Sequence, residues 1–330
     1  MTTQPAMIVQ GLTKDYTYFE KEEGLRGSLR ALFARKTLKR RAVADFSFTL
    51  ENGGIVGLMG PNGAGKTTLI KMLTGILHPT AGSAAVLGHD PARPTDAYKK
   101  QYALVMGQKS QLWWDLPAAD TFLLNQAIYE IPEEIFRRNV QQYAAMFGVE
   151  DLLKVPVRQL SLGERMKMEL IASLLHNPQV LFLDEPTIGL DAIAQRQIRD
   201  LVRQVNQERG VAVLLTSHYM EDIRSLCDRV MVIRKGQKIY DGSLDALLDR
   251  YKEYMTVNLR FATTCPWIVP ADVECLERSA IQLSARMPRE RVRSFLHEAL
   301  QACEGADVRI EEEDMGDLVE IVDRLEGAAQ

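Results

Sequence analysis

The chain has 330 residues, of which 46% are hydrophobic and 25% are charged, and its formal net charge is -4 at pH 7. This length allows one large α/β domain and a smaller second domain. The mild acidity argues against an extended nucleic-acid-binding surface, and no apolar run approaches the about 20 residues that a membrane-spanning helix needs.

The N-terminus and the cysteines bear on location. The first ten residues, MTTQPAMIVQ, lack the basic start and apolar core of a signal peptide, so we expect a cytoplasmic protein. The cysteines have no C-x-x-C spacing and no histidine at zinc-finger distance, so we expect reduced thiols and no structural zinc. They are Cys227, Cys265, Cys275 and Cys303.

A basic stretch separates the first two predicted strands, at 7–12 and 42–50. Residues 24–41 carry seven Lys or Arg and no acidic residue, and their leucines recur at helical spacing. Such an amphipathic helix can lie against an anionic inner leaflet or dock on a membrane-protein partner. It can also pack its apolar face on its own domain, or contact nucleic acid, and the sequence leaves these alternatives open.

The stretch GPNGAGKTT at 60–68 fits the phosphate-binding pattern G-x-x-x-x-G-K-[ST]. It joins an apolar segment at 55–59, expected to be a strand, to a helical pattern at 69–77. Glycines let the backbone approach phosphates, and a helix N-terminus favours an anion. We expect Lys66 to reach the β- and γ-phosphates and the Thr67 hydroxyl to be a ligand for Mg2+.

Beyond this loop, strands alternate with helices, which predicts a largely parallel sheet. Strands are expected at 83–88, 102–106, 180–186 and 211–216, helices at 95–101, 118–130, 132–147, 160–176, 192–208 and 219–227, and a hairpin at 230–242. Ligands bind such sheets at the carboxyl ends of the strands. Gln108, Asp184, Glu185 and His218 all fall at predicted strand ends, so we expect one nucleotide site there.

Past about residue 245 these motifs stop. Strands at 254–261, 281–285 and 307–312 and helices at 288–302 and near 315–326 indicate a small α+β module with an acidic end. We find no chemistry in it.

Residues 7–245 resemble the nucleotide-binding subunit of an ABC transporter, because the motifs occur in that family's order. GPNGAGKTT resembles the Walker A loop, Gln108 the Q-loop glutamine, LSLGE at 160–164 the signature LSGGQ, VLFLDEPT at 180–187 Walker B with its following glutamate, GLD at 189–191 the D-loop, and His218 the switch histidine. Tyr16 matches the aromatic residue that stacks on adenine. Tyr18 or Phe19 are alternatives, because an insertion at about 17–41 follows directly.

The resemblance implies an α/β fold with a P-loop NTPase core, a mostly parallel sheet, an antiparallel β subdomain and an α-helical subdomain. The ATP-binding domain would span 1–245, with the helical subdomain at about 109–175, and a small C-terminal α+β accessory domain would span 246–330.

The resemblance also implies ATP and Mg2+ as cofactors and assigns the site. Thr67, Gln108 and Asp184 would hold the metal. Glu185 would polarise the attacking water and His218 would orient it, with Lys66 and Gln108 completing the catalytic set. The implied nucleotide-binding residues are Tyr16, Gly60, Asn62, Gly63, Gly65, Lys66, Thr67, Thr68, Ser161, Gly163 and Asp191.

In this family two subunits face head to tail, and each ATP lies between the Walker A loop of one and the signature of the other. The resemblance therefore implies a second copy of the chain as a partner. This sequence departs from LSGGQ at Leu162, which replaces a glycine, and at Glu164, which replaces glutamine. Glu164 places a carboxylate near a polyphosphate and puts the geometry and rate in doubt.

One-piece exporters of the family carry their own membrane spans, so this chain is expected to work with separate permease subunits at the cytoplasmic face of the membrane. The resemblance is closest to bacterial exporters of drugs, polysaccharides or lipid-linked glycans, and no nucleic-acid partner is expected. Trp113 and Trp114, just after the Q-loop, either anchor the permease or pack inside the helical subdomain.

Two other functions stay open. One is a non-transport ABC ATPase in DNA repair or on the ribosome, although such relatives usually carry coiled-coil or zinc insertions or two ATPase domains. The other is a regulatory module that uses ATP only as a dimerisation switch, against which Glu185 and His218 argue. Cargo is not encoded in this chain.

Overall fold

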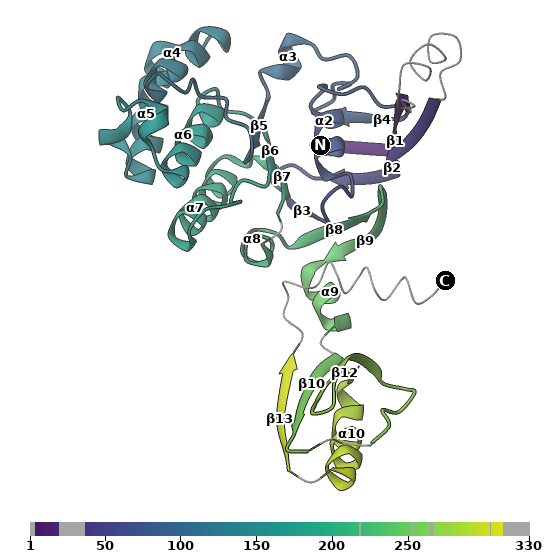
Figure 1. The fold of residues 1–330 in the computed structure, drawn as a ribbon. Coiled ribbons are helices and arrows are strands. Elements are labelled where there is room, and N and C mark those ends of the chain that lie inside the picture. The colour runs from purple at the N-terminus through teal and green to yellow at the C-terminus, as the bar shows by residue number, and fades with distance from the viewer. Residues whose placement is uncertain are drawn as a thin grey trace, which may run out of the picture. The chain divides into compact units, whose positions relative to one another are not determined.

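The computed structural model describes residues 4–19, 37–217, 219–251, 254–263, 267–303 and 305–312. The chain divides into two compact units, Met1–Asp241 and Gly242–Gln330 (Figure 1).

A six-stranded sheet with the order β5-β6-β7-β3-β8-β9 forms the centre of the first unit. Its strands are β3 (Ile55–Met59), β5 (Tyr102–Met106), β6 (Val180–Asp184), β7 (Ala212–Thr216), β8 (Arg229–Arg234) and β9 (Gln237–Ser243). The pairs β5–β6, β6–β7, β7–β3 and β3–β8 are parallel. All residues of β6 and β7 are buried, which is typical of a parallel sheet covered on both faces. The loops that follow β3, β5, β6 and β7 therefore meet at one edge.

A second, antiparallel sheet has the order β2-β1-β4, with β1 at Met7–Phe19, β2 at Thr37–Leu50 and β4 at Ala81–Val86. The first two strands are longer than the sequence indicated, so Tyr16 lies within β1. Residues 37–41, predicted as the end of a basic helix, are strand, and that part of the prediction is wrong. Cross-strand pairing explains the difference, because Tyr16 is paired with Arg40 and Asp15 with Arg41. Residues 24–36 of the predicted helix lie outside the described residues.

The helices of the first unit fall into two groups (Figure 1). Helices α4, α5 and α6 cluster beside β5, whereas α2, α7 and α8 lie closer to the sheet. The helices are α2 (Lys66–Leu73), α3 (Asp96–Lys99), α4 (Ala118–Ile128), α5 (Glu133–Phe147), α6 (Leu162–Leu174), α7 (Ala192–Arg209) and α8 (Met220–Leu226), with short 3-10 turns at Glu150–Leu152 and Val157–Gln159. Their positions agree with the predicted ones within a few residues.

One hydrophobic core joins the two sheets of the first unit. It combines Phe46 of β2, Leu69 of α2 and Phe182 of β6, none of which is exposed. The antiparallel sheet is thereby packed against the helix that follows the phosphate loop, which fixes the position of β1 and β2 relative to that loop.

The second unit is a four-stranded antiparallel sheet, ordered β11-β12-β10-β13, with α10 packed on it. Its elements are α9 (Leu244–Tyr251), β10 (Tyr254–Phe261), β11 (Glu274–Arg278), β12 (Gln282–Pro288), α10 (Arg289–Ala302) and β13 (Ala306–Glu312). Phe295 and Ala299 of α10 are fully buried in its core. The sequence reasoning missed α9 and β11, and the predicted helix near 315–326 lies outside the described residues.

The cysteines differ from one another. Cys227 and Cys275 are free thiols, as expected. Cys303 is disulfide-bonded, so the prediction of a reduced thiol is wrong there. Within the described segments, no helix combines the length and the apolarity needed to cross a membrane.

Candidate nucleotide-binding and catalytic site

The loop between β3 and α2 has a backbone that needs glycine. Gly65 precedes the first residue of α2 and has a φ of 118°. A Cβ at this position would lie 2.4 Å from the carbonyl oxygen of Ala42 on β2. Gly65, the N-cap, has no side chain with which to cap the helix N-terminus, so the first amide groups of α2 stay available to an anion. The loop is therefore shaped by β2 as well as by its own sequence.

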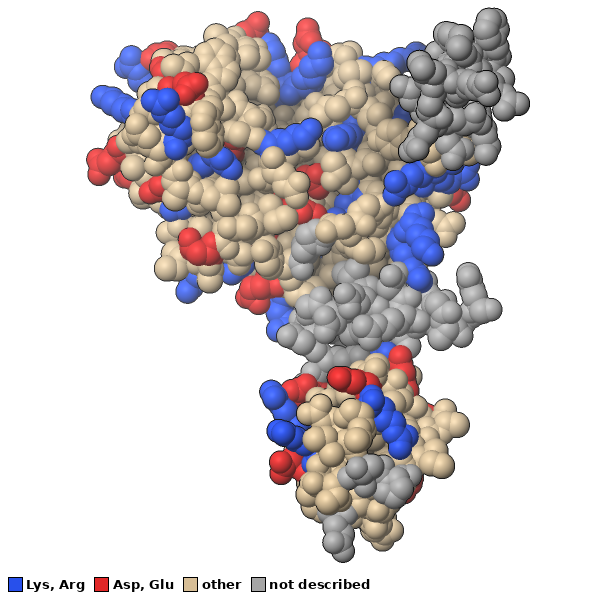
Figure 2. Space-filling model, viewed as in Figure 1, with Lys and Arg blue, Asp and Glu red and all other residues tan. Residues whose placement is uncertain are grey.

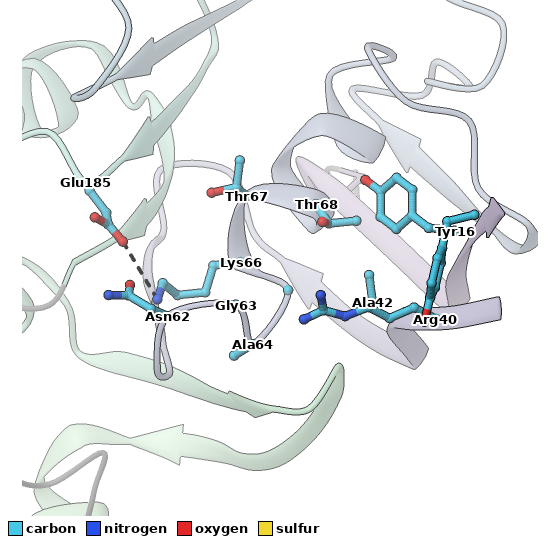
Figure 3. A pocket seen from close by; sticks show the side chains of 12 residues that line it. Tyr16, Arg40, Ala42, Asn62, Gly63, Ala64, Lys66, Thr67, Thr68 and Glu185 are labelled. Atoms are coloured by element: carbon cyan, nitrogen blue, oxygen red, sulfur yellow. Dashed lines mark ion pairs between the residues drawn. The ribbon is translucent and has the colours of Figure 1, made fainter. Parts of the chain in front are cut away.

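Lys66, the first residue of α2, is buried and folds back over the loop. Its Nζ donates to the carbonyl oxygens of Gly60 at 2.6 Å and Pro61 at 3.2 Å, and lies 3.7 Å from Glu185 Oε1 (Figure 3). Burial lowers the pKa of the ammonium group, and the carboxylates of Glu185 and Asp184 act in the opposite direction. The lysine thus lies among oxygen atoms at the position where the sequence predicts phosphates.

Asp184, the last residue of β6, connects three loops of the sheet edge. Its Oδ2 accepts a 2.7 Å hydrogen bond from Thr67 Oγ1, and its Oδ1 accepts one of 2.7 Å from Thr216 Oγ1. Thr67 comes from the phosphate loop and Thr216 from the end of β7. Both carboxylate oxygens are therefore held, and the Thr67 hydroxyl lies next to a carboxylate as the sequence predicts for a metal site.

Glu185 follows directly and has an unusual backbone. Its φ is 56°, in the left-handed region that few residues other than glycine adopt. Its amide group donates to the carbonyl oxygen and to the hydroxyl of Thr216, each at 3.0 Å. Its side chain is 14% exposed and faces Lys66. Uncommon backbone conformations that hydrogen bonds hold in place, as here, cluster at functional sites.

Two cavities adjoin the phosphate loop. The larger, of about 720 Å³, extends from the loop to β1 and β2, and the smaller, of about 360 Å³, extends to the residues after β5. The larger is lined by Tyr16, Tyr18, Arg40, Ala42, Asn62, Gly63, Ala64, Gly65, Lys66, Thr67, Thr68 and Glu185. The smaller is lined by Asn62, Thr67, Lys71, Met106, Gln108, Lys109, Asp184 and Glu185. The structure thus brings together most of the predicted site residues.

Tyr16 and Arg40 face each other across β1 and β2 at the end of the larger cavity away from Glu185 (Figure 3). Tyr16 is 39% exposed, which leaves its ring accessible for stacking, and Tyr18 lines the same cavity. The guanidinium of Arg40 reaches toward the loop, because a Cβ on Gly63 would be 4.0 Å from its Nη2. Lys and Arg side chains are visible on this side of the first unit and also over its helical cluster (Figure 2).

Several predicted site residues do not line these cavities. Gly60 contacts Lys66 through its carbonyl oxygen. Asp191 caps α7, where its Oδ1 accepts hydrogen bonds from the amides of Ile193 and Ala194, each at 2.9 Å. His218 lies outside the described residues.

The signature segment forms the N-terminus of α6. Ser161 is the N-cap, and its hydroxyl accepts from the Glu164 amide at 3.3 Å. Glu164 returns the contact, since its Oε2 accepts from the amide and from the hydroxyl of Ser161, each at 2.8 Å. These hydrogen bonds lower the pKa of the Glu164 carboxyl. Ser161 and Gly163 thus present a polar helix end that neither cavity includes.

Sequence reasoning missed Arg40, Ala42 and Thr216. The first two were assigned to the basic stretch and to a strand without a role, and nothing local marks their proximity to the loop. Thr216 precedes Ser217 and His218, and a hydroxyl at the end of a buried strand is a signal that could have singled it out.

The ABC transporter family matches residues 43–188. The chain is 32% identical over 209 residues to the ABC transporter ATP-binding protein NatA of Bacillus subtilis, covering 63% of this chain and 85% of NatA. It is 36% identical over 208 residues to the daunorubicin resistance ATP-binding protein DrrA3 of Streptomyces coeruleorubidus, covering 63% of this chain and 65% of that protein.

A solved structure shares the fold. It is the dimeric structure of an ATP-binding cassette in a post-hydrolysis state, bound to ADP and Pi, and it superposes with a TM-score of 0.60 at 21% identity, covering 72% of this chain and 98% of that one. The fold is therefore that of an ABC ATPase domain, as the sequence predicted. The phosphate loop, the carboxylates that face it and the similarity to NatA over most of its length lead to one conclusion: the chain belongs to the family of ABC transporter ATP-binding proteins, an ATPase family.

Proposed function

We propose that this chain is the ATP-hydrolysing subunit of an ABC exporter, which works as a head-to-tail dimer and drives separate permease subunits. The observation that carries this proposal is the convergence of Lys66, Thr67, Asp184 and Glu185 around one loop, at the carboxyl edge of a parallel sheet.

The donor set fits Mg2+ rather than a softer metal. Mg2+ is usually held by one or two carboxylates, waters and substrate phosphates, not by a cage of protein ligands. The Thr67 hydroxyl and an Asp184 oxygen are 2.7 Å apart, and Gln108 lines the same cavity. No cluster of three or more His, Cys, Asp or Glu side chains with the geometry of a metal site occurs in the described part of the chain. Thr67, Asp184 and Gln108 would hold the ion, which when bound supplies charge neutralisation at the β- and γ-phosphates.

The chain's own residues divide the remaining work. Lys66 would exchange its contacts with Gly60 and Pro61 for phosphate oxygens, and the free amides of the loop and of α2 would bind the others. Glu185 would accept a proton from the attacking water, because its carboxylate is at the end of the phosphate loop cavity and is fixed through its backbone. His218 would orient that water. Tyr16, with Tyr18 beside it, would stack on the adenine.

We infer the dimer from the position of the signature residues, which lie outside the described cavities. Ser161 and Gly163 lie at a helix N-terminus outside both cavities, so they would reach a γ-phosphate only across an interface with a second copy. Asp191, at the start of α7, would lie at the same interface. The dimeric state of the related ATP-binding cassette supports this arrangement.

Permease contact and export rest on separate observations. Trp113 and Trp114 are 51% and 53% exposed, which favours the anchor role over packing inside the helical cluster. Their position after the β5 loop would connect a permease to Gln108. The resistance protein DrrA3 among the relatives supports export. We propose peripheral attachment at the cytoplasmic face through the permease, with residues 246–330 as an accessory module. The exposed Lys39 and Arg41 on β2 would supply an additional contact to the inner leaflet.

The decisive experiment replaces Glu185 with Gln. General-base assistance contributes about 100- to 10,000-fold, so kcat for ATP should fall by at least about 100-fold while nucleotide binding persists. Glu130→Gln is the matched control, because Glu130 is an exposed glutamate paired with Lys100. A Glu185→Gln variant that hydrolyses ATP at the parental rate would remove the assignment.

A further inference from the structure

A fully buried carboxylate lies behind the site, on α8. Asp222 has no exposed surface, and its two oxygens bind different groups. Its Oδ2 accepts from Ser217 Oγ at 2.6 Å and also from Thr187 Oγ1. Its Oδ1 accepts from Arg199 Nη1 at 3.0 Å. A buried charge of this kind is retained only with a complete set of partners, and Asp222 has one cation and two hydroxyl donors.

The partners come from three separate parts of the fold. Thr187 lies two residues after Glu185, in the loop that follows β6. Ser217 follows β7 and directly precedes position 218. Arg199 lies on α7, the helix that Asp191 caps. Because the two hydroxyl groups share one oxygen atom of Asp222, the loop that carries Glu185 and the residue that follows β7, Ser217, are held next to each other.

Each loop is also restrained next to Asp222. The Ser217 hydroxyl accepts from the Tyr219 amide at 3.0 Å, so the residues on both sides of position 218 take part. On the other loop, Gln195 Nε2 donates to the carbonyl oxygens of Thr187 at 3.4 Å and Leu190 at 3.2 Å. Asp222 is therefore a common acceptor for both loops, in addition to the hydrogen bonds that the Glu185 amide donates to Thr216.

We propose that Asp222 is a positioning residue for ATP hydrolysis, which holds the loop of Glu185 against Ser217 at the end of β7 by binding both the Thr187 and the Ser217 hydroxyl. The inference rests on the catalytic roles proposed above and adds a residue that touches neither nucleotide nor water. A misplacement of about 1 Å in a catalytic group can cost about 100-fold in rate, so loss of either hydroxyl should lower turnover although both lie behind the site.

A structural role alone is the competing explanation. An acidic residue in the first turn of a helix and a buried ion pair both stabilise a fold without any effect on catalysis. Replacing Asp222 itself would not separate the two, because Arg199 would be left buried without its carboxylate and the protein could unfold. The hydroxyl partners are better targets, since their removal leaves the ion pair in place.

The experiment compares Thr187→Val, Ser217→Ala and the double variant with the conservative exchanges Thr187→Ser and Ser217→Thr, all in the full-length chain. We expect each hydroxyl removal to lower kcat for ATP by about 10-fold or more with KM changed less than about 2-fold, and each conservative exchange to restore most of it. Because both hydroxyls end on one oxygen, the double variant should lose less than the product of the single losses.

Ser173→Ala is the matched control, because Ser173 is also a buried hydroxyl but donates to Leu170 within α6. Its kcat should equal that of the parent. If Thr187→Val and Ser217→Ala lower only the melting temperature and leave kcat intact while Glu185→Gln abolishes turnover, the positioning role is wrong and the proposed function stands. If Glu185→Gln leaves turnover intact, the catalytic assignment and this inference both fall.

Discussion

Gly107→Ala is a test of the site that changes no catalytic side chain. Gly107 follows β5, and its amide donates to the Asp184 carbonyl oxygen at 2.9 Å. A Cβ here would lie 2.0 Å from the carbonyl oxygen of Glu185 and 3.1 Å from Ile188 Cγ2. Ordinary contact begins near 3.4 Å, so the backbone at Glu185 must move by more than about 1 Å. It cannot relax freely, since the Glu185 amide is tied to Thr216.

The displacement of the Glu185 backbone predicts a lower rate of ATP hydrolysis. A shift of about 1 Å in a catalytic group costs about 100-fold, and we expect kcat for ATP to fall by that order. Overpacking of this kind also lowers the free energy of unfolding by about 1–3 kcal/mol, which a folded domain can tolerate. The assay is steady-state ATP hydrolysis at saturating ATP, with binding of a fluorescent ATP analogue and urea unfolding measured on the same preparation.

Gly148→Ala is the control: it adds a methyl group at a glycine without displacing a neighbouring backbone. Gly148 ends α5 with a φ of 62°, and nothing lies within 4 Å of the Cβ it would gain. This control should lose about 1 kcal/mol of stability and keep its kcat. If folded Gly107→Ala protein turns over ATP within about threefold of the parent, the backbone position of Glu185 does not control the reaction and the reasoning is refuted.

Three further predictions concern the helical cluster. Glu164→Gln removes the carboxylate that engages Ser161, so ATP-dependent dimerisation measured by analytical ultracentrifugation should tighten by about two- to five-fold, as for an exposed charge. Burial raises the pKa of the Glu169 carboxyl, although hydrogen bonds from Ser110 and two amides act in the opposite direction. The folded state therefore favours the protonated form of Glu169. Its contribution to the free energy of unfolding is greatest below pH 4.5, the usual pKa, and declines as the pH rises. Glu169→Gln should therefore gain stability relative to the parent as the pH rises above 4.5, measured by urea unfolding. Replacing Trp113 and Trp114 with Ala should abolish co-purification with the permease and leave basal ATP hydrolysis unchanged.

Each of these has an outcome that contradicts it. Unchanged or weaker dimerisation of the Glu164 variant would mean that the carboxylate does not oppose the second subunit. A stability difference that is the same at every pH would show that Glu169 titrates as in the unfolded chain. Permease recovered in full with the double Ala variant would exclude the tryptophans as anchors, and Ile268→Ala, at 80% exposure in the other unit, shows what loss of an unrelated apolar side chain does.

Local signals in the sequence were sufficient for most elements. The alternation and the apolar runs located β5 and β10 to the residue, and the spacing of GPNGAGKTT identified the phosphate loop, because these patterns depend on neighbours within one strand or turn. They failed at residues 37–41, predicted as the end of a helix whose apolar spacing lies at 25–33, because these five residues each pair with a residue of β1. Pairing between distant strands is a tertiary effect that local periodicity does not contain.

The sequence by itself therefore determined the family, the loop, and the residues Lys66, Thr67, Asp184 and Glu185 that such a loop requires. Only the tertiary structure decided which other groups surround them. Arg40 faces the loop because β2 pairs with β1, Thr216 holds Asp184 because β7 is beside β6, and Asp222 connects two loops because α8 packs behind both. Each of these contacts involves residues that are far apart in the sequence, or far from the sequence motifs. Such contacts form only once the sheet has assembled.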